Sequence, residues 1–262
     1  MTSASAVRVA AVGLLSSLAA CAGVCWAYVW LARRRLRPRL KLTYFDIAGL
    51  GEQLRLGLAL AQIPFEDERL PSAAEGYAEV TRRRAAGLLP FGQLPTLQVD
   101  GRVYAQSNAL LRYVGRLGGL YPDGVEGLHC DMVLEAWADV DARLAPQHYK
   151  CALPRSPIDG IPQVPLSAEQ QSQVARHLND DALPIMLGRI ARVLASSPGP
   201  WFCGHMLTIA DVKSYVVVNG LADGSYASGI HARVLDSCPE LRDHAQRVAA
   251  LPAIQRWLAS VE

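Results

Sequence analysis

The stretch from Phe91 to Ala109 restricts the possible folds of this chain more than any other segment. Asp100 and Gly101 stand between two apolar runs, which is a strong sequence signal for a two-residue hairpin turn. Pro95 has no N–H to donate to a sheet, so it should stand at the start or edge of a strand, where a cis peptide bond is plausible. The sequence therefore predicts a β-hairpin entered through a proline.

A helix should follow this hairpin directly. Ser107 stands where an N-cap residue would, ahead of apolar residues at helical spacing, which are Leu110, Leu111, Tyr113, Val114 and Leu117. A helix N-terminus offers unpaired N–H groups and a positive dipole end, and both favour an anion. Together with the backbone beside Pro95, this arrangement predicts a pocket suited to an extended, peptide-like ligand.

These motifs resemble the second half of the thioredoxin-like domain of cytosolic glutathione transferases. In that family the proline is cis, and the residues just before it pair with the cysteinyl backbone of glutathione. The resemblance implies that Gln93 and Leu94, beside Pro95, hold the cysteinyl unit. It also implies that Gln106 and Ser107 hold the γ-glutamyl end of the tripeptide.

Residues 40–46, Leu-Lys-Leu-Thr-Tyr-Phe-Asp, read as a strand and are similar to the sigma-class pattern Lys-Leu-Thr-Tyr-Phe. In that class the tyrosine is catalytic, and the matching residue here is Tyr44. A phenol that donates a hydrogen bond to the glutathione sulfur favours the thiolate, which is the nucleophile. Taken alone, Tyr44 reads as an ordinary strand aromatic. The other motifs, at the family's spacing, favour the catalytic interpretation.

The resemblance implies an α/β thioredoxin-like domain over residues 40–121, followed by an all-α bundle domain over residues 122–262. A helix from Gly49 and a second strand over residues 65–70 complete the expected β-α-β-α-β-β-α order. The helical domain would supply most of the electrophile pocket. Asp131 matches the position from which an acidic side chain reaches across a dimer to the ligand's amino group, and an ordinary solvated helix face explains it equally well.

Several positions depart from the sigma-class pattern. Leu50 stands where a basic residue commonly lies beside glutathione, and Gln93 stands where lysine is common. The segment after the second strand is longer than in typical relatives. Its aromatic ligand contact would fall on Tyr77 and its basic contact on one of Arg82, Arg83 or Arg84, although an arginine run is by default a solvated helix face.

Two features of the helical domain lie outside the glutathione site. A proline-rich loop over residues 153–166 is long enough to be functional or mobile, and we expect it near the electrophile pocket. Thr208 and Asp211 have capping-box spacing ahead of an apolar helix, which predicts a structural role and no chemistry.

Residues 1–39 are expected to be a membrane anchor with a basic flank. About 23 uncharged residues, 9–31, suffice for a helix to cross roughly 30 Å of hydrocarbon. Arginines follow this run, so the positive-inside rule places the rest of the chain in the cytosol. A cleaved secretory signal has the opposite charge asymmetry. A lipoprotein box at residues 18–21 would be followed by polar sequence, which is absent here, so we favour the retained anchor.

Charge and ligand spacing exclude several other functions. Six of the 26 basic residues and no acidic residue precede Lys41, so the remainder carries 20 basic and 24 acidic residues. That balance argues against a nucleic-acid surface. The cysteines include no Cys-x-x-Cys pair and the histidines show no ligand spacing, so we expect no metal site.

The sequence thus predicts a membrane-anchored, homodimeric glutathione transferase of a sigma-like class, with glutathione as co-substrate and a hydrophobic electrophile as second substrate. Two alternatives stay open. One is a glutathione-dependent isomerase of the prostaglandin-synthase type, which would use the same thiolate. The other is a non-catalytic protein of the same fold that binds glutathione or hydrophobic molecules, which the uncharged Leu50 and Gln93 support. The electrophile itself is not readable from fold-level features.

Overall fold

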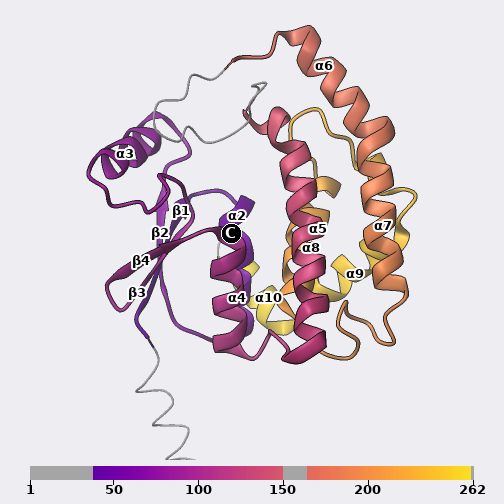
Figure 1. Cartoon of the computed structure of the whole chain (residues 1–262), viewed down its shortest axis with the longest axis horizontal. Helices are drawn as coiled ribbons and strands as arrows, with labels where there is room; N and C mark the ends of the chain where they lie inside the picture. Colours follow the sequence, from indigo (N-terminus) through magenta and orange to yellow (C-terminus); the bar gives the residue numbers. More distant parts are fainter. Residues whose placement is uncertain (1–37, 150–163, 261–262) are drawn as a thin grey trace, which may run out of the picture. The chain divides into compact units, whose positions relative to one another are not determined.

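The computed structural model describes residues 38–149 and 164–260 (Figure 1). The predicted membrane segment, residues 9–31, and nearly all of the proline-rich loop lie outside these ranges. Within them, no helix combines the length and the apolar character needed to cross a membrane. The chain divides into two units, residues 1–39 and residues 40–262, and every element named here belongs to the second unit.

A mixed sheet forms the first half of this unit. Its strands are β1 (Leu40–Phe45), β2 (Glu66–Leu70), β3 (Thr96–Val99) and β4 (Arg102–Ala105), in the spatial order β2-β1-β3-β4. β1 pairs parallel with β2 and antiparallel with β3, and β3 pairs antiparallel with β4. Leu42 and Leu97 lie opposite each other and are fully buried. Alternate apolar residues of the central strands therefore anchor the sheet to the core.

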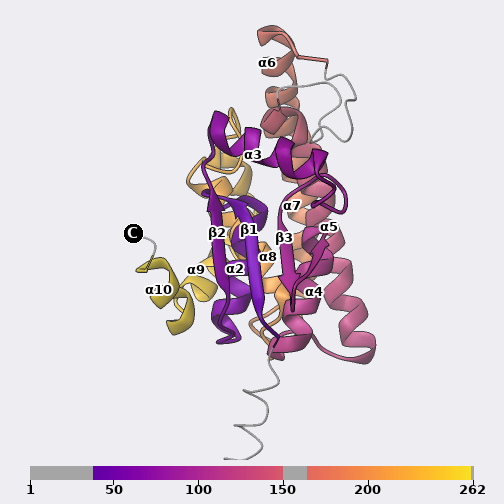
Figure 2. The same ribbon diagram turned by 90° about the vertical axis from the view of Figure 1, so that its left-hand side faces the viewer.

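The helices of this half are α2 (Gly49–Leu60), α3 (Ala74–Ala85) and α4 (Ser107–Gly118). α2 and α4 lie on the face of the sheet that is turned toward α5 and α8, as Figure 1 and Figure 2 show. The two helices approach closely at Gly57, where an added Cβ would lie 3.2 Å from Val114. The predicted β-α-β-α-β-β-α order of a thioredoxin-like fold is confirmed.

The second half is helical, as predicted. Its elements are α5 (Gly124–Tyr149), α6 (Ala168–His177), the π-helical turn η1 (Leu178–Ala182), α7 (Leu183–Ala195), α8 (Ile209–Ala222), the 3-10 turn η2 (Ala232–Leu235), α9 (Pro239–Ala249) and α10 (Pro252–Leu258). α8 is buried along most of its length, and the fully buried Trp137 of α5 belongs to the same core as Leu54 of α2. One continuous apolar core therefore joins the sheet half to the helical half.

The predicted capping box at the start of α8 is present. The backbone N–H of Thr208 donates to the Asp211 carboxylate at 2.8 Å, and both residues are fully buried. The other carboxylate oxygen accepts from the Phe202 N–H at 2.9 Å and lies 2.8 Å from Nε2 of His244 on α9. Asp211 thus joins the start of α8 to the preceding loop and to α9.

Candidate active site

The hairpin predicted around the proline is present and begins as expected. The Leu94–Pro95 peptide bond is cis, and β3 starts at the next residue. Asp100 and Gly101 have φ values of 48° and 91°, and the two-residue turn that suits a hairpin requires positive φ at both positions. Gln93, two residues before Pro95, is half-buried.

The start of α4 differs by one residue from the prediction. Gln106 is the N-cap residue, with φ 78° and ψ 99°, and its side chain makes no capping bond. Ser107 is the first residue of the helix and is half-buried. A positive φ in a residue other than glycine is held against a local penalty of about 1–3 kcal/mol, and such residues concentrate at binding sites. The first N–H groups of a helix have no partner within it, so the start of α4 offers donors next to this residue.

The strand register brings the separate motifs to one edge of the sheet. Thr43 of β1 pairs with Thr96 of β3, and Thr96 pairs with Ala105 of β4. Tyr44, Pro95 and Gln106 each stand one residue from these paired positions, at the same end of three adjacent strands. Residues far apart in the sequence are therefore neighbours here. The prediction did not use this register, which can be deduced only after the strand order is known.

Tyr44 is the penultimate residue of β1, and its ring lies against the first turn of α2. The residue is 8% exposed, and its hydroxyl accepts a hydrogen bond from the Leu50 N–H at 3.3 Å. Two glycines make room for it: a Cβ on Gly49 would lie 2.8 Å from the hydroxyl, and a Cβ on Gly51 would lie 2.4 Å from the ring. Leu50 therefore contributes a backbone donor to Tyr44.

A buried cation that the sequence analysis did not single out lies beside Tyr44. The Arg55 side chain is fully buried, and the guanidinium carbon is 5.9 Å from the centre of the Tyr44 ring. Arg55 donates to the carbonyl oxygens of Phe45 at 3.2 Å and Ile47 at 2.8 Å, so it also fixes the turn between β1 and α2. The sequence signal for this residue is a single arginine among the leucines of α2. An arginine is rarely fully buried unless acceptors surround it, so its place in an apolar helix indicates a polar network.

The arginine run on α3 divides into different roles. Arg82 pairs with Glu79 at the surface, as a solvated helix face predicts. Arg84 instead donates through Nε and Nη2 to the Gly92 carbonyl oxygen, at 3.1 and 2.9 Å, and so holds the loop that precedes Gln93. Tyr77, also on α3, is 59% exposed, and its ring centre lies 5.0 Å from that of Phe45.

Arg83 reaches the sheet and makes a testable ion pair. Its guanidinium, opposed by burial, holds the pKa of the Glu68 carboxyl at about 2 instead of 4.5. A lowered pKa stabilises the fold above pH 4.5, and that contribution is lost as the pH falls toward 2. Because the pair is partly exposed, we expect wild type to lose about 1 kcal/mol more over that range than Glu68→Gln. Urea unfolding at a series of pH values measures this difference. The control is Glu75→Gln at an exposed position, whose free energy of unfolding should depend on pH as that of wild type does.

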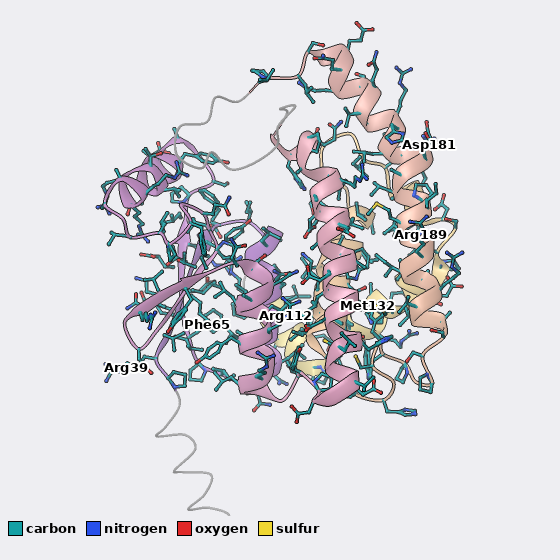
Figure 3. All side chains as sticks on the ribbon, viewed as in Figure 1. Arg39, Phe65, Arg112, Met132, Asp181 and Arg189 are labelled. Atoms are coloured by element: carbon teal, nitrogen blue, oxygen red, sulfur yellow. The ribbon has the colours of Figure 1, made fainter. Side chains whose placement is uncertain are left out.

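Asp131 lies on α5, and both of its carboxylate oxygens have partners within the chain. One accepts from Nε of Arg112 at 2.7 Å and the other from the Tyr121 hydroxyl at 2.9 Å. Arg112, labelled in Figure 3, comes from α4, so this cluster ties α4 to α5. Asp131 remains 34% exposed. A further contact with a ligand of a neighbouring subunit stays a prediction.

In the parts of the chain that the structure describes, no cluster of three or more histidine, cysteine or acidic side chains is arranged to hold a metal ion. Within the same ranges, Cys130, Cys203 and Cys238 are buried free thiols.

The chain matches known proteins in both halves. Residues 51–117 match the glutathione S-transferase N-terminal domain, and residues 161–261 match the glutathione S-transferase C-terminal domain. Over 223 residues it is 34% identical to glutathione S-transferase 1 of Ascaris suum, a match that covers 85% of this chain and 96% of that protein. The chain belongs to the glutathione S-transferase family. The expected family and enzyme class are thereby confirmed, and glutathione is the co-substrate of this family.

Other relatives of this transferase include prostaglandin synthases as well as a further glutathione S-transferase. It is 30% identical over 224 residues to hematopoietic prostaglandin D synthase of Gallus gallus, covering 84% of this chain and 96% of that one. The crystal structure of the glutathione S-transferase from Ascaris lumbricoides is 29% identical, with a TM-score of 0.65 and coverage of 86% of this chain and 98% of that chain. The structure of prostaglandin synthase D of Nilaparvata lugens shares the fold, with a TM-score of 0.70 at 22% identity over 86% of this chain and all of that one.

Proposed function

We propose that this sigma-like glutathione transferase joins reduced glutathione to hydrophobic electrophiles through a thiolate that Tyr44 stabilises. The observation that carries the proposal is the strand register, which sets Tyr44, the cis Pro95 and Gln106 at one edge of the sheet. Residues 40–121 would bind glutathione, and residues 122–262 would supply most of the electrophile pocket.

The tripeptide would bind in an extended form along this edge. Gln93 and Leu94 would pair with the cysteinyl backbone beside Pro95. Gln106 and Ser107 would hold the γ-glutamyl end, with its carboxylate against the N–H groups at the start of α4. This pose leaves the sulfur at Tyr44.

Tyr44 would act by donating its hydroxyl proton in a hydrogen bond to the sulfur. The Leu50 N–H donates to the same phenol oxygen, which polarises the O–H bond, and the positive charge of Arg55 lies near the ring. The thiol proton leaves to solvent, and the thiolate is stabilised where it forms. A sulfur lone pair then attacks the electrophilic carbon, a carbon–sulfur bond forms, and a leaving group such as chloride departs with its electron pair.

Titration of the bound thiol tests this proposal without any substitution. The ultraviolet absorbance of the thiolate reports its ionisation, and glutathione bound to the full chain should ionise about 2 pH units below free glutathione. Binding with an unshifted thiol would support the non-catalytic alternative. Absence of glutathione binding would contradict the assignment of the whole site.

A second candidate is isomerisation of a cyclic peroxide of the prostaglandin-precursor type. The similarity to hematopoietic prostaglandin D synthase of Gallus gallus favours it specifically. The same thiolate would open the peroxide bridge, and glutathione would be regenerated at the end. Product analysis separates the two reactions, because conjugation consumes glutathione in proportion to product and isomerisation does not.

We also propose that the enzyme is a homodimer. Exposed apolar side chains follow one stripe of α5, with Val125 79%, Leu128 70% and Met132 49% exposed. An apolar stripe of this kind on a soluble helix indicates a protein contact. Asp131 is adjacent to this stripe, as a contribution to the partner's ligand would need. Sedimentation equilibrium of the purified enzyme measures the mass directly.

The amino-terminal anchor remains a proposal from sequence. The uncharged run 9–31 and the arginines after it support a retained membrane helix with the catalytic unit on the cytosolic side. The full chain should stay with membranes through alkaline washing, whereas a chain that lacks residues 1–39 should not.

A further inference from the structure

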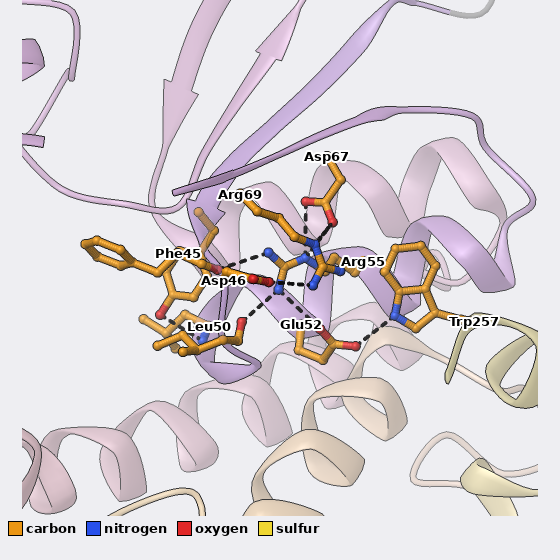
Figure 4. A network of polar contacts seen from close by, with 10 residues as sticks. Phe45, Asp46, Leu50, Glu52, Arg55, Asp67, Arg69 and Trp257 are labelled. Atoms are coloured by element: carbon orange, nitrogen blue, oxygen red, sulfur yellow. Dashed lines mark hydrogen bonds and ion pairs between the residues drawn. The ribbon is translucent and has the colours of Figure 1, made fainter. Parts of the chain in front are cut away.

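The last helix of the chain is hydrogen-bonded to the first helix of the glutathione-binding half. Nε1 of Trp257, on α10, donates to Oε1 of Glu52, on α2, at 2.8 Å (Figure 4). The indole also packs against the Phe65 ring at 5.8 Å between ring centres, and the Arg69 guanidinium lies 6.0 Å from the indole. Trp257 is thus held by both a polar contact and ring contacts.

Glu52 passes this contact on to the turn that carries the Tyr44 donor. Its other carboxylate oxygen accepts from Nη1 of Arg55 at 3.3 Å, and Arg55 in turn binds the turn carbonyls of Phe45 and Ile47. Leu50, the second residue of α2, follows this turn and donates through its N–H to Tyr44. Figure 4 shows the contacts from Trp257 to the turn carbonyls, and beside them the Leu50–Tyr44 contact. Polar contacts therefore lead from α10 to the turn between β1 and α2, and the backbone from Ile47 to Leu50 joins that turn to the donor of Tyr44.

The Trp257 N–H matters because Glu52 has only a share of the Arg55 cation. Arg55 is shared between Glu52 and Asp67, which accepts from its Nε at 3.0 Å, so neither carboxylate has the cation to itself. Glu52 is only 14% exposed. If the indole N–H is removed, one oxygen of a largely buried carboxylate loses its donor, and hydration of that oxygen draws Glu52 toward solvent and away from Arg55. Arg55 then holds the turn carbonyls less firmly.

We propose that Trp257 is a positioning residue for Tyr44, acting through Glu52 and Arg55, so that docking of the C-terminal helix tunes how strongly the thiolate is stabilised. This inference rests on the proposed function of Tyr44. Trp257 touches neither glutathione nor the electrophile in this scheme. Its effect should therefore fall on thiol ionisation and kcat, with little change in glutathione affinity.

The test compares Trp257→Phe with a matched control, Trp201→Phe, in the full chain. Phe keeps a ring at each position and removes only the indole N–H and some area. Trp201 lies before α8, where its ring packs on His244 at 5.9 Å, remote from Glu52 along the contact network. We expect Trp257→Phe to raise the pH of thiol ionisation in bound glutathione by about half a unit and to lower kcat about three- to tenfold. KM for glutathione should stay within about twofold, and Trp201→Phe should change none of these.

A second variant keeps the test decisive if Trp257→Phe folds poorly. Glu52→Gln keeps an acceptor for the indole but removes the charge that faces Arg55, so it should shift thiol ionisation in the same direction. The double variant should be no worse than Glu52→Gln alone, since both changes act on one network. Additive effects, or a Trp257→Phe enzyme with a lower melting temperature but wild-type thiol ionisation, would overturn the inference. If Tyr44→Phe also leaves thiol ionisation unchanged, the proposed function fails first.

Discussion

Replacing Tyr44 with Phe should lower kcat for a chloronitrobenzene substrate about 100-fold and leave KM for glutathione within about twofold. Phe fills the same space against Gly49 and Gly51, where there is no room for a larger ring displacement. It removes one fixed hydrogen-bond donor from the position where the sulfur becomes charged. In the proposed pose the glutathione backbone is held by Gln93 and Leu94 and by the start of α4, so binding of the tripeptide should survive.

Steady-state kinetics and the thiolate absorbance together measure this effect. The thiol of glutathione bound to Tyr44→Phe should ionise near the pH of free glutathione. Tyr113→Phe, on α4, removes a hydroxyl from a tyrosine that is 37% exposed and should behave as wild type. If Tyr44→Phe turns over as fast as wild type, another group stabilises the thiolate and the assignment of Tyr44 is wrong.

The parts of the site that sequence could predict are those fixed by local backbone chemistry. Three such features act over a few residues each: a proline that cannot donate, an Asp-Gly pair that accepts positive φ, and a strand-like alternation. They were enough to predict the hairpin at Pro95 and the order of the strands and helices. The predicted N-cap, Ser107, was wrong by one residue because only local residue preference was used. Residue preference alone places the cap on a serine, whereas Gln106 holds the strained backbone position.

The parts that sequence could not predict depend on contacts between distant segments. Trp257 and Glu52 are 205 residues apart, and nothing in either local pattern pairs them. Leu50 appeared to weaken the site because its side chain lacks a charge, yet it is its backbone N–H that meets Tyr44. The cation near Tyr44 comes from Arg55, whose burial becomes evident only when β1, β2 and α2 are assembled. Side-chain identity is a poor guide where the backbone supplies the contact.

Replacing Asp211 with Ala should lower the free energy of unfolding by about 3–5 kcal/mol, the largest stability effect we expect. The fully buried carboxylate accepts from the backbone N–H groups of Phe202 and Thr208, from the Thr208 hydroxyl at 2.9 Å, and contacts His244. Ala supplies no acceptor, so these donors lose their partner in a space that the core closes to water. Asn keeps one oxygen and should lose about half as much.

Urea unfolding of the full chain measures this loss, with Asp236→Ala as the matched control. Asp236 also has a side-chain partner, Arg242 at 2.7 Å, but its own side chain is 67% exposed, so its removal should change the free energy of unfolding by less than about 1 kcal/mol. Because Asp211 lies away from the Tyr44 edge of the sheet, the folded fraction of Asp211→Asn should keep a wild-type kcat. Equal unfolding midpoints for the Asp211 and Asp236 variants would show that the start of α8 does not depend on its buried carboxylate. A loss of kcat in the folded fraction would instead couple this cap to the catalytic edge.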